Sequence, residues 1–320
     1  MATSLNNLGN VLRGLGELPA ARDHYQRALA IFQARLGPDH PDVARCLNNL
    51  GGVLGSLGEL PAARDHHQRA QAIFQARLGP DHPDVASNLD NLGIVLRRLG
   101  ELDAARDAHQ RALAIRQVRA GPDHPDVARS LDNLGIVLCR RGELPAARDA
   151  HQRALGIRQA RLGADHPHVA HSLSSLGSVQ YELGELPAAH DYYQRALAIL
   201  EARLGADHPD VATSLGNLGN ALCRLGELPA ARDYYQRALA VFEARLGPDH
   251  PDVAQTRASL ATVLDELGEA PGARTHDQRT LAIFEARVGS GNPLTTTLRT
   301  DLARVRSASG QPPEHPAWDR

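Results

Sequence analysis

The chain has 320 residues, with 35 basic and 37 acidic side chains and a formal net charge of −2. The chain therefore lacks the surplus of basic residues that binding to nucleic acid or to an anionic membrane requires, and these two kinds of partner are excluded. Every basic residue is an arginine, so a phosphate-binding P-loop, which needs a lysine, is excluded within these residues. No apolar run approaches the 18 residues of a membrane span, and the three cysteines are few, so we expect a soluble, cytoplasmic protein.

Along the chain, one pattern returns every 42 residues. The triplet Asp-His-Pro first occurs at 39–41 and last at 249–251, and Gly-Glu-Leu follows the same period from 16–18 to 226–228. A fixed period between 20 and 50 residues is typical of proteins built from stacked repeats. We therefore read the chain as one repeat array and not as two or three separate domains.

The period from 39 to 78 begins with a predicted helix. Asp39 is placed to cap it, and Pro41 suits the first helical turn, where its missing N–H costs nothing. Gly58 stands where a left-handed glycine closes a helix. The apolar side chains between these ends recur at helical spacing, and they are Leu47, Leu50, Leu54 and Leu57.

A second predicted helix starts around Pro61 and ends before Gly79. Its apolar stripe consists of Ala63, Ala70, Ile73 and Leu78. One helical hairpin cannot bury both stripes by itself, so neighbouring hairpins must stack to cover them.

These residues resemble the tetratricopeptide repeat, whose pattern is matched here by Leu50-Gly51, Leu54, Gly58, Ala63, His67 and Ala70. The longer period and the linker LGPDHPDVA resemble the kinesin light chain class of these repeats, which also occurs in bacteria. The resemblance implies an all-α, right-handed superhelical solenoid that binds a protein or a peptide. One departure is the aromatic position of the second helix, which is occupied by Tyr25, His67, His109, His151, Tyr193, Tyr235 and Asp277.

The pattern predicts seven helix hairpins followed by a capping helix. The units are expected at about 1–37, 38–79, 80–121, 122–163, 164–205, 206–247 and 248–288. Residues 289–308 are predicted to form the capping helix, which a solenoid needs to cover its last apolar face. The polar tail 309–320 is expected to be disordered, and docking of the tail through Trp318 is the alternative.

The first residues, MATSLNNLG, match VATSLGNLG at 211–219, so Met1 occupies a valine position. One interpretation is an internal start with coding sequence upstream. The other is a genuine start on a truncated first helix.

We find no catalytic constellation and predict neither an enzyme nor a cofactor site. The carboxylates recur as helix-cap and first-turn residues, which a structural role explains. Six histidines lie in the Asp-His-Pro linkers, but equivalent positions in stacked hairpins are too far apart to share one metal ion. We therefore predict no metal site.

The candidate binding surface is a second stripe on the first helix of each hairpin. In tetratricopeptide repeat proteins, which this chain resembles, that stripe lines the concave groove and holds extended peptides. One of its positions is nearly constant across the units and is occupied by Asn7, Asn49, Asn91, Asn133 and Asn217. A side-chain amide both donates and accepts hydrogen bonds, so this ladder could grip a peptide backbone. Alternatively, the asparagines stabilise packing between the first helices.

Two further positions of the stripe vary between units and could select the ligand. They include Ile94 and Ile136, and Arg98, Arg140 and Arg224. With Arg97 and Arg129 nearby, the arginines predict affinity for an acidic segment beside an apolar one. Asp90 and Asp132 are expected to neutralise part of that charge.

The sequence thus predicts a non-catalytic scaffold that binds a peptide or partner protein, not nucleic acid or membrane. It leaves the oligomeric state open. The alternative is the sensor or autoinhibitory region of a larger bacterial signalling NTPase or protease.

Overall fold

The computed structural model describes residues 1–269, 272, 275 and 278–281. Most of the second helix of the predicted seventh hairpin, the predicted capping helix and the tail lie outside this described part. Within it, thirteen α-helices and no strand are present. Contacts divide the chain into two compact units, Met1–Arg161 and Leu162–Arg320, and each is considered by itself below.

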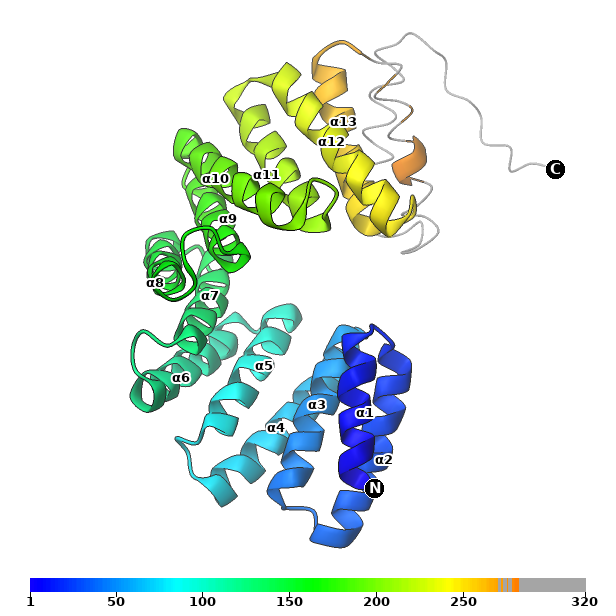
Figure 1. Cartoon of the computed structure of the whole chain (residues 1–320), viewed down its shortest axis with the longest axis vertical. Coiled ribbons are helices and arrows are strands. Elements are labelled where there is room, and N and C mark those ends of the chain that lie inside the picture. The colour runs from blue at the N-terminus through cyan, green and yellow to red at the C-terminus, as the bar shows by residue number, and fades with distance from the viewer. Residues whose placement is uncertain (270–271, 273–274, 276–277, 282–320) are drawn as a thin grey trace, which may run out of the picture. The chain divides into compact units, whose positions relative to one another are not determined.

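The first unit contains four helix pairs. They are α1 (Ala2–Gly14) with α2 (Leu18–Leu36), α3 (Pro41–Ser56) with α4 (Leu60–Leu78), α5 (Pro83–Leu99) with α6 (Leu102–Ala120), and α7 (Pro125–Arg140) with α8 (Leu144–Leu162). Consecutive helices pack antiparallel, and each second helix from α2 to α6 also packs on the first helix of the next pair (Figure 1). This is the stacking that the two apolar stripes of each hairpin require.

The second unit continues the same arrangement. It contains α9 (Pro167–Glu182) with α10 (Leu186–Leu204), α11 (Pro209–Leu225) with α12 (Leu228–Leu246), and α13 (Pro251–Glu266). Helix α10 packs against both α9 and α11, and α12 packs against both α11 and α13. The predicted all-α solenoid of helix hairpins is therefore confirmed.

Glycine closes the helices as the sequence predicts. Gly58 follows α3 with a φ of 86°, and Gly79 follows α4 with a φ of 88°. Both φ values are positive, which residues with a Cβ rarely adopt.

The predicted cap at Asp39 is wrong, because the capping residue is the neighbouring His40. The His40 Nδ1 atom accepts a hydrogen bond from the backbone N–H of Asp42 at 3.2 Å. An imidazole nitrogen thus satisfies a free N–H of the first turn, the task usually performed by a serine or aspartate oxygen. The equivalent linker histidines cap in the same way, and they are His82, His124, His166, His208 and His250.

The core lies between the helices, and it includes the predicted stripe residues Leu47, Leu50 and Leu54. The histidines in the aromatic position pack as rings. The His67 ring is fully buried against Gly51, where an added Cβ would lie 2.8 Å from Nε2. Tyr25 packs on Gly9 in the same manner. The glycine of the Leu-Gly pair in α1, α3, α5, α7, α9 and α11 therefore makes room for the ring of the partner helix.

Candidate binding surface

The A-helix face is defined here as the surface formed by the positions of Asn49, Gly52 and Ser56 in each first helix. These positions are three and four residues apart, so they lie on one side of the helix. In the unit Met1–Arg161 the face belongs to α1, α3, α5 and α7. In the unit Leu162–Arg320 it belongs to α9, α11 and α13.

The asparagines of the A-helix face contact the preceding first helix. The Asn49 Nδ2 atom donates to Asn6 Oδ1 at 3.2 Å, and Asn91 Nδ2 donates to Asn48 Oδ1 at 3.0 Å. These amides therefore help to join neighbouring hairpins, and their own Oδ1 atoms can still accept. Asn7 is exposed, whereas Asn49, Asn91, Asn133 and Asn217 are half-buried.

Three arginines lie close together at the carboxyl ends of α5 and α7. Burial lowers the pKa of Arg97, and the positive charges of Arg140 and Arg98 lower it further. Arg98 and Arg140 are exposed, and Arg98 Nη1 donates to the backbone carbonyl of Gly55. We call Arg97, Arg98 and Arg140 the arginine cluster. Because like charges repel, this cluster favours an anion in contact with it.

Two apolar side chains lie one helical turn before the arginine cluster. Ile94 of α5 is 36% exposed and Ile136 of α7 is 37% exposed. Each is four residues before the exposed arginine of its own helix, so the isoleucine and the arginine share one side of the helix.

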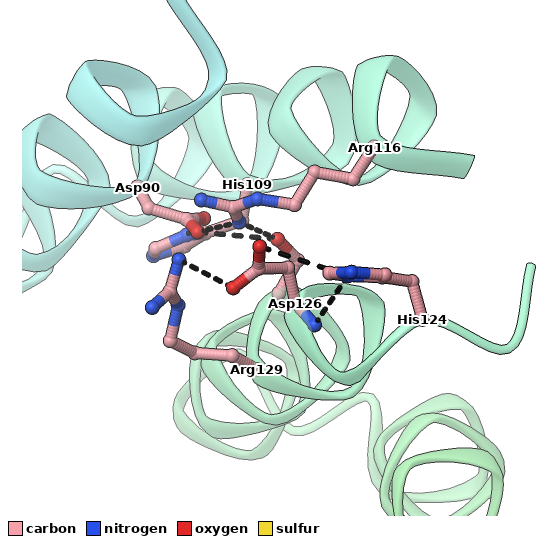
Figure 2. A network of polar contacts seen from close by, with 7 residues as sticks. Asp90, His109, Arg116, His124, Asp126 and Arg129 are labelled. Atoms are coloured by element: carbon pink, nitrogen blue, oxygen red, sulfur yellow. Dashed lines mark hydrogen bonds and ion pairs between the residues drawn. The ribbon is translucent and has the colours of Figure 1, made fainter. Parts of the chain in front are cut away.

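The expected neutralisation of this charge by Asp90 is wrong. The Asp90 side chain is buried and belongs to a network below the surface (Figure 2). It lies 2.9 Å from His109 Nδ1, accepts a hydrogen bond from Ser130 at 3.1 Å, and pairs with Arg116. Burial by itself would raise the pKa of Asp90, but the contacts with His109 and Arg116 outweigh it and lower that pKa.

Asp132 behaves in the same way in the next hairpin. It lies 3.0 Å from His151 Nδ1 and pairs with Arg158. Asp90 and Asp132 are therefore committed to arginines of α6 and α8, and neither ion pair involves Arg98 or Arg140.

Sequence reasoning missed this network, although a signal was present. Arg116 and Arg158 stand where the first two hairpins carry Phe32 and Phe74. In the same two hairpins an aspartate replaces asparagine, since Asp90 and Asp132 correspond to Asn6 and Asn48. A buried cation requires a nearby anion, so the two substitutions compensate each other.

The other predicted arginines are occupied by local partners. Arg129 pairs with Asp126 at 3.0 Å, at the start of α7, as Figure 2 shows. Arg224 belongs to the unit Leu162–Arg320, where its Nη1 atom donates to the Tyr181 carbonyl at 2.9 Å. Its guanidinium also lies over the Tyr181 ring, 4.5 Å from the centroid. The structure therefore brings Arg98 and Arg140 together with Arg97 but gives Arg224 a separate aromatic partner.

Among the residues that the structure describes, no group of three or more histidine, cysteine, aspartate or glutamate side chains could hold a metal ion. No helix in that part of the chain has the length and apolar character to cross a membrane.

Comparison with known proteins places this geometry in a family. A model of the tetratricopeptide repeat matches six overlapping segments, which are 1–76, 47–117, 95–160, 126–202, 191–244 and 210–286. No curated protein matches the chain.

Solved structures with the same fold include nearly identical TPR-like repeats of a kinesin light chain-like protein from Podosopora anserina. That structure has a TM-score of 0.55 and 20% identity over 64% of this chain and 97% of its own. The apo form of RapI has a TM-score of 0.68 and 16% identity over 88% of this chain and 97% of its own. The Cut9–Hcn1 hetero-tetramer of the APC/C has a TM-score of 0.61 and 18% identity over 90% of this chain and 48% of the matched chain. With its 42-residue period and its helix pairs, the chain belongs to the tetratricopeptide repeat family.

Proposed function

We propose that the chain is a protein-interaction scaffold that holds an extended segment of a partner protein on its A-helix face. The observation that carries this proposal is the arginine cluster at the carboxyl ends of α5 and α7. The carboxylates nearest in sequence, Glu101 and Glu143, pair with Arg64 and Arg141. Asp90 and Asp132 pair with arginines of α6 and α8, so the positive charge of the cluster is available to a ligand.

The chemistry of the neighbouring residues defines the ligand more closely. A carboxylate of the partner would accept the N–H donors of Arg98 and Arg140 in charge-assisted hydrogen bonds. The exposed Ile94 and Ile136 would cover an apolar side chain of the same segment. The free Oδ1 atoms of the asparagine ladder would accept from the N–H groups of its backbone. Asn7, Asn49, Asn91 and Asn133 are the ladder residues of this unit, and Asn217 with Arg224 extends the proposal to the other unit.

Likeness to other proteins supports the general class. Tetratricopeptide repeats are known chiefly as protein-binding modules, and the Cut9–Hcn1 structure is that of an assembly of two different proteins. The partner of this chain is proposed from its own residues.

The test is affinity capture from lysate of the source organism, using the wild-type chain and the variant Arg98→Glu/Arg140→Glu. We expect the wild type to retain a partner that the variant loses, and we expect this partner to dissociate from the wild type as salt is raised. A synthetic acidic segment of the captured partner should then bind the wild type at least tenfold more tightly than the variant, measured by fluorescence anisotropy.

The matched control is Arg69→Glu/Arg111→Glu, which makes the same charge change at exposed positions of the second helices α4 and α6. This control should retain the partner. Loss from both variants would indicate a general charge effect, and retention by both would refute the role of the arginine cluster.

A further inference from the structure

A pocket of about 360 Å³ opens on the A-helix face of the unit Leu162–Arg320, between α11 and α13. Its volume is within the range of about 300–1,000 Å³ that is typical of small-ligand sites. The buried aromatic rings of Tyr235 and Phe242 belong to its wall. Its polar lining consists of Thr213, Asn217, Asn220, Asp252, Gln255, Thr256 and Ser259.

The pocket exists because Gly216 interrupts the ladder between first helices. Gly216 corresponds to Asn6 and Asn48, whose Oδ1 atoms accept hydrogen bonds from the next first helix. A Cβ added to Gly216 would meet no atom within 4 Å. The volume that an asparagine would occupy is therefore open, and Ser259, at the position of the donating asparagine, has no such acceptor opposite it.

The pocket carries the carboxylate of Asp252, which pairs with no arginine of residues 1–269. Each Asp-His-Pro linker is followed by a first-turn residue equivalent to Asp252, and the structure shows two sites from which arginine reaches such a carboxylate. Arg45 reaches Asp42 from three residues later at 2.8 Å and reaches Asp84 from the preceding first helix at 3.2 Å. Three residues after Asp252 the chain has Gln255, and the residue of the preceding first helix that corresponds to Arg45 is Thr213. Neither position around Asp252 therefore carries an arginine.

The one basic side chain paired with Asp252 in the described part of the chain is His250, with Nδ1 at 3.7 Å. However, that Nδ1 atom accepts a hydrogen bond from the Asp252 backbone N–H at 3.2 Å. A nitrogen that accepts carries no proton, so it donates nothing to the carboxylate. Among the residues that the structure describes, no opposite charge therefore matches that of Asp252.

The neighbouring groups favour a ligand with several N–H donors. Within the described residues, no side-chain hydrogen bond involves the amides of Asn217 or Gln255, so their oxygens can accept. Tyr235 donates its hydroxyl proton to Asn220 Oδ1 at 2.5 Å. A guanidinium group presents five donors in one plane and binds both carboxylates and aromatic rings.

We propose that this pocket binds the side chain of an arginine from a partner protein. The inference rests on the proposed function and deepens it, because it assigns to the A-helix face of one unit a contact with a basic residue of the partner. The arginine cluster of the other unit would take an acidic contact, and the two sites would therefore select different parts of a partner.

The probe is N-acetyl-arginine N-methylamide, titrated into the full chain labelled with ¹⁵N-glycine. We expect saturable shifts of the Gly216 and Gly219 amide signals. The citrulline analogue has nearly the same shape without the charge and should bind at least tenfold more weakly. The lysine analogue should also bind more weakly, since it lacks the planar fork of donors. Equal binding of the citrulline analogue would refute the charge recognition, and equal binding of the lysine analogue would refute the preference for guanidinium.

The key variant is Gly216→Asn, which restores the residue of the first two hairpins. It should abolish the shift of Gly219 while keeping the chain folded, because asparagine is a better helix residue than glycine. Asp252→Asn should weaken binding at least fivefold. The control Gly156→Ala changes a helical glycine of α8 that also has open space around it, and it should bind the probe like the wild type.

Unchanged binding to Gly216→Asn would overturn the proposal. Failure here can be separated from failure of the proposed function. A chain that captures its acidic partner but ignores the arginine probe would refute only this inference. A chain that binds the probe but captures no partner would refute only the arginine-cluster proposal.

Discussion

At the scale of single residues, a histidine that replaces a tyrosine ring in the core brings a titratable group into a buried position. His67 is fully buried, with Nδ1 3.2 Å from Asn88 Oδ1. Its Nε2 atom is also buried and has no hydrogen-bond partner. Burial lowers the pKa of His67 to about 4, although the hydrogen bond to Asn88 raises it in part. The folded chain therefore holds this imidazole neutral.

This lowered pKa predicts acid sensitivity. In the unfolded chain His67 has an ordinary pKa near 6.5, so between about pH 6.5 and pH 4 the unfolded state binds the additional proton. Stability from this group is fully present above pH 6.5 and is lost as the pH falls to about 4. The expected loss is at most about 3 kcal/mol. The urea midpoint of the chain, measured by circular dichroism across this range, should report it.

The matched comparison is His67→Tyr/Asn88→Ser, which reproduces the pair Tyr193 and Ser214 of a later hairpin. This variant should show a shallower fall in the urea midpoint between pH 6.5 and pH 4. An unchanged slope would mean that other groups cause the acid sensitivity.

At the scale of helices, the network around Asp90 joins α5, α6 and α7 through buried charge. Arg116 is 6% exposed and Asp90 is 4% exposed. Removing one member of a buried ion pair leaves the other charge unmatched in an apolar environment, whereas replacing both members by packed neutral residues can be neutral or stabilising.

A double-mutant cycle tests this argument. Asp90→Asn and Arg116→Phe should each destabilise the chain by about 3–5 kcal/mol. The double variant, which carries the residues of the first two hairpins, should be close to the wild type in free energy of unfolding. A double variant whose loss equals the sum of the two single losses would show that the pair is not coupled.

Two adjacent glycines of α3 provide a second test at this scale. Gly51→Ala would place a Cβ 2.8 Å from His67 Nε2, whereas the atom nearest to a Cβ at Gly52 lies 3.7 Å away. We expect Gly51→Ala to destabilise the chain by about 1–3 kcal/mol, because the core is overpacked. Gly52→Ala should stabilise it by up to about 1 kcal/mol, because alanine is the better helix residue. Urea denaturation of both variants measures the difference, and equal effects would contradict the close packing of the His67 ring.

At the scale of the whole molecule, each hairpin contacts mainly its neighbours. The stability of such an array is a sum over repeats and the interfaces between them. Within the described part of each unit, the helices pack within one hairpin or on the adjacent hairpin, and this should confine the effect of a substitution.

Hydrogen exchange of the Gly51→Ala variant provides the measurement. Backbone amides of α3, α4 and the adjacent α2 and α5 should exchange faster than in the wild type, whereas those of α11 to α13 should keep their wild-type rates. Equal acceleration along the whole chain would indicate a single cooperative unit instead of an array.

The repeat itself determined most of the fold. The Leu-Gly pairs, the glycines at helix ends and the prolines in first turns recur with the period, and local physics alone assigns them to hairpins that must stack. A cap was harder to assign, since Asp39 and His40 both offer an acceptor and only the backbone geometry decides which one faces the free N–H groups.

The tertiary structure decided which side chains meet across helices. Asp90 could have neutralised Arg98 on its own helix, but it is paired with Arg116 of the next helix, because burial makes a nearby charge partner more valuable than an exposed one. The pocket beside Gly216 is a second example, because Asp252 and Ser259 of the neighbouring first helix also line it. The period identifies equivalent positions within a hairpin, whereas the contacts between hairpins depend on distances that only the packed helices fix.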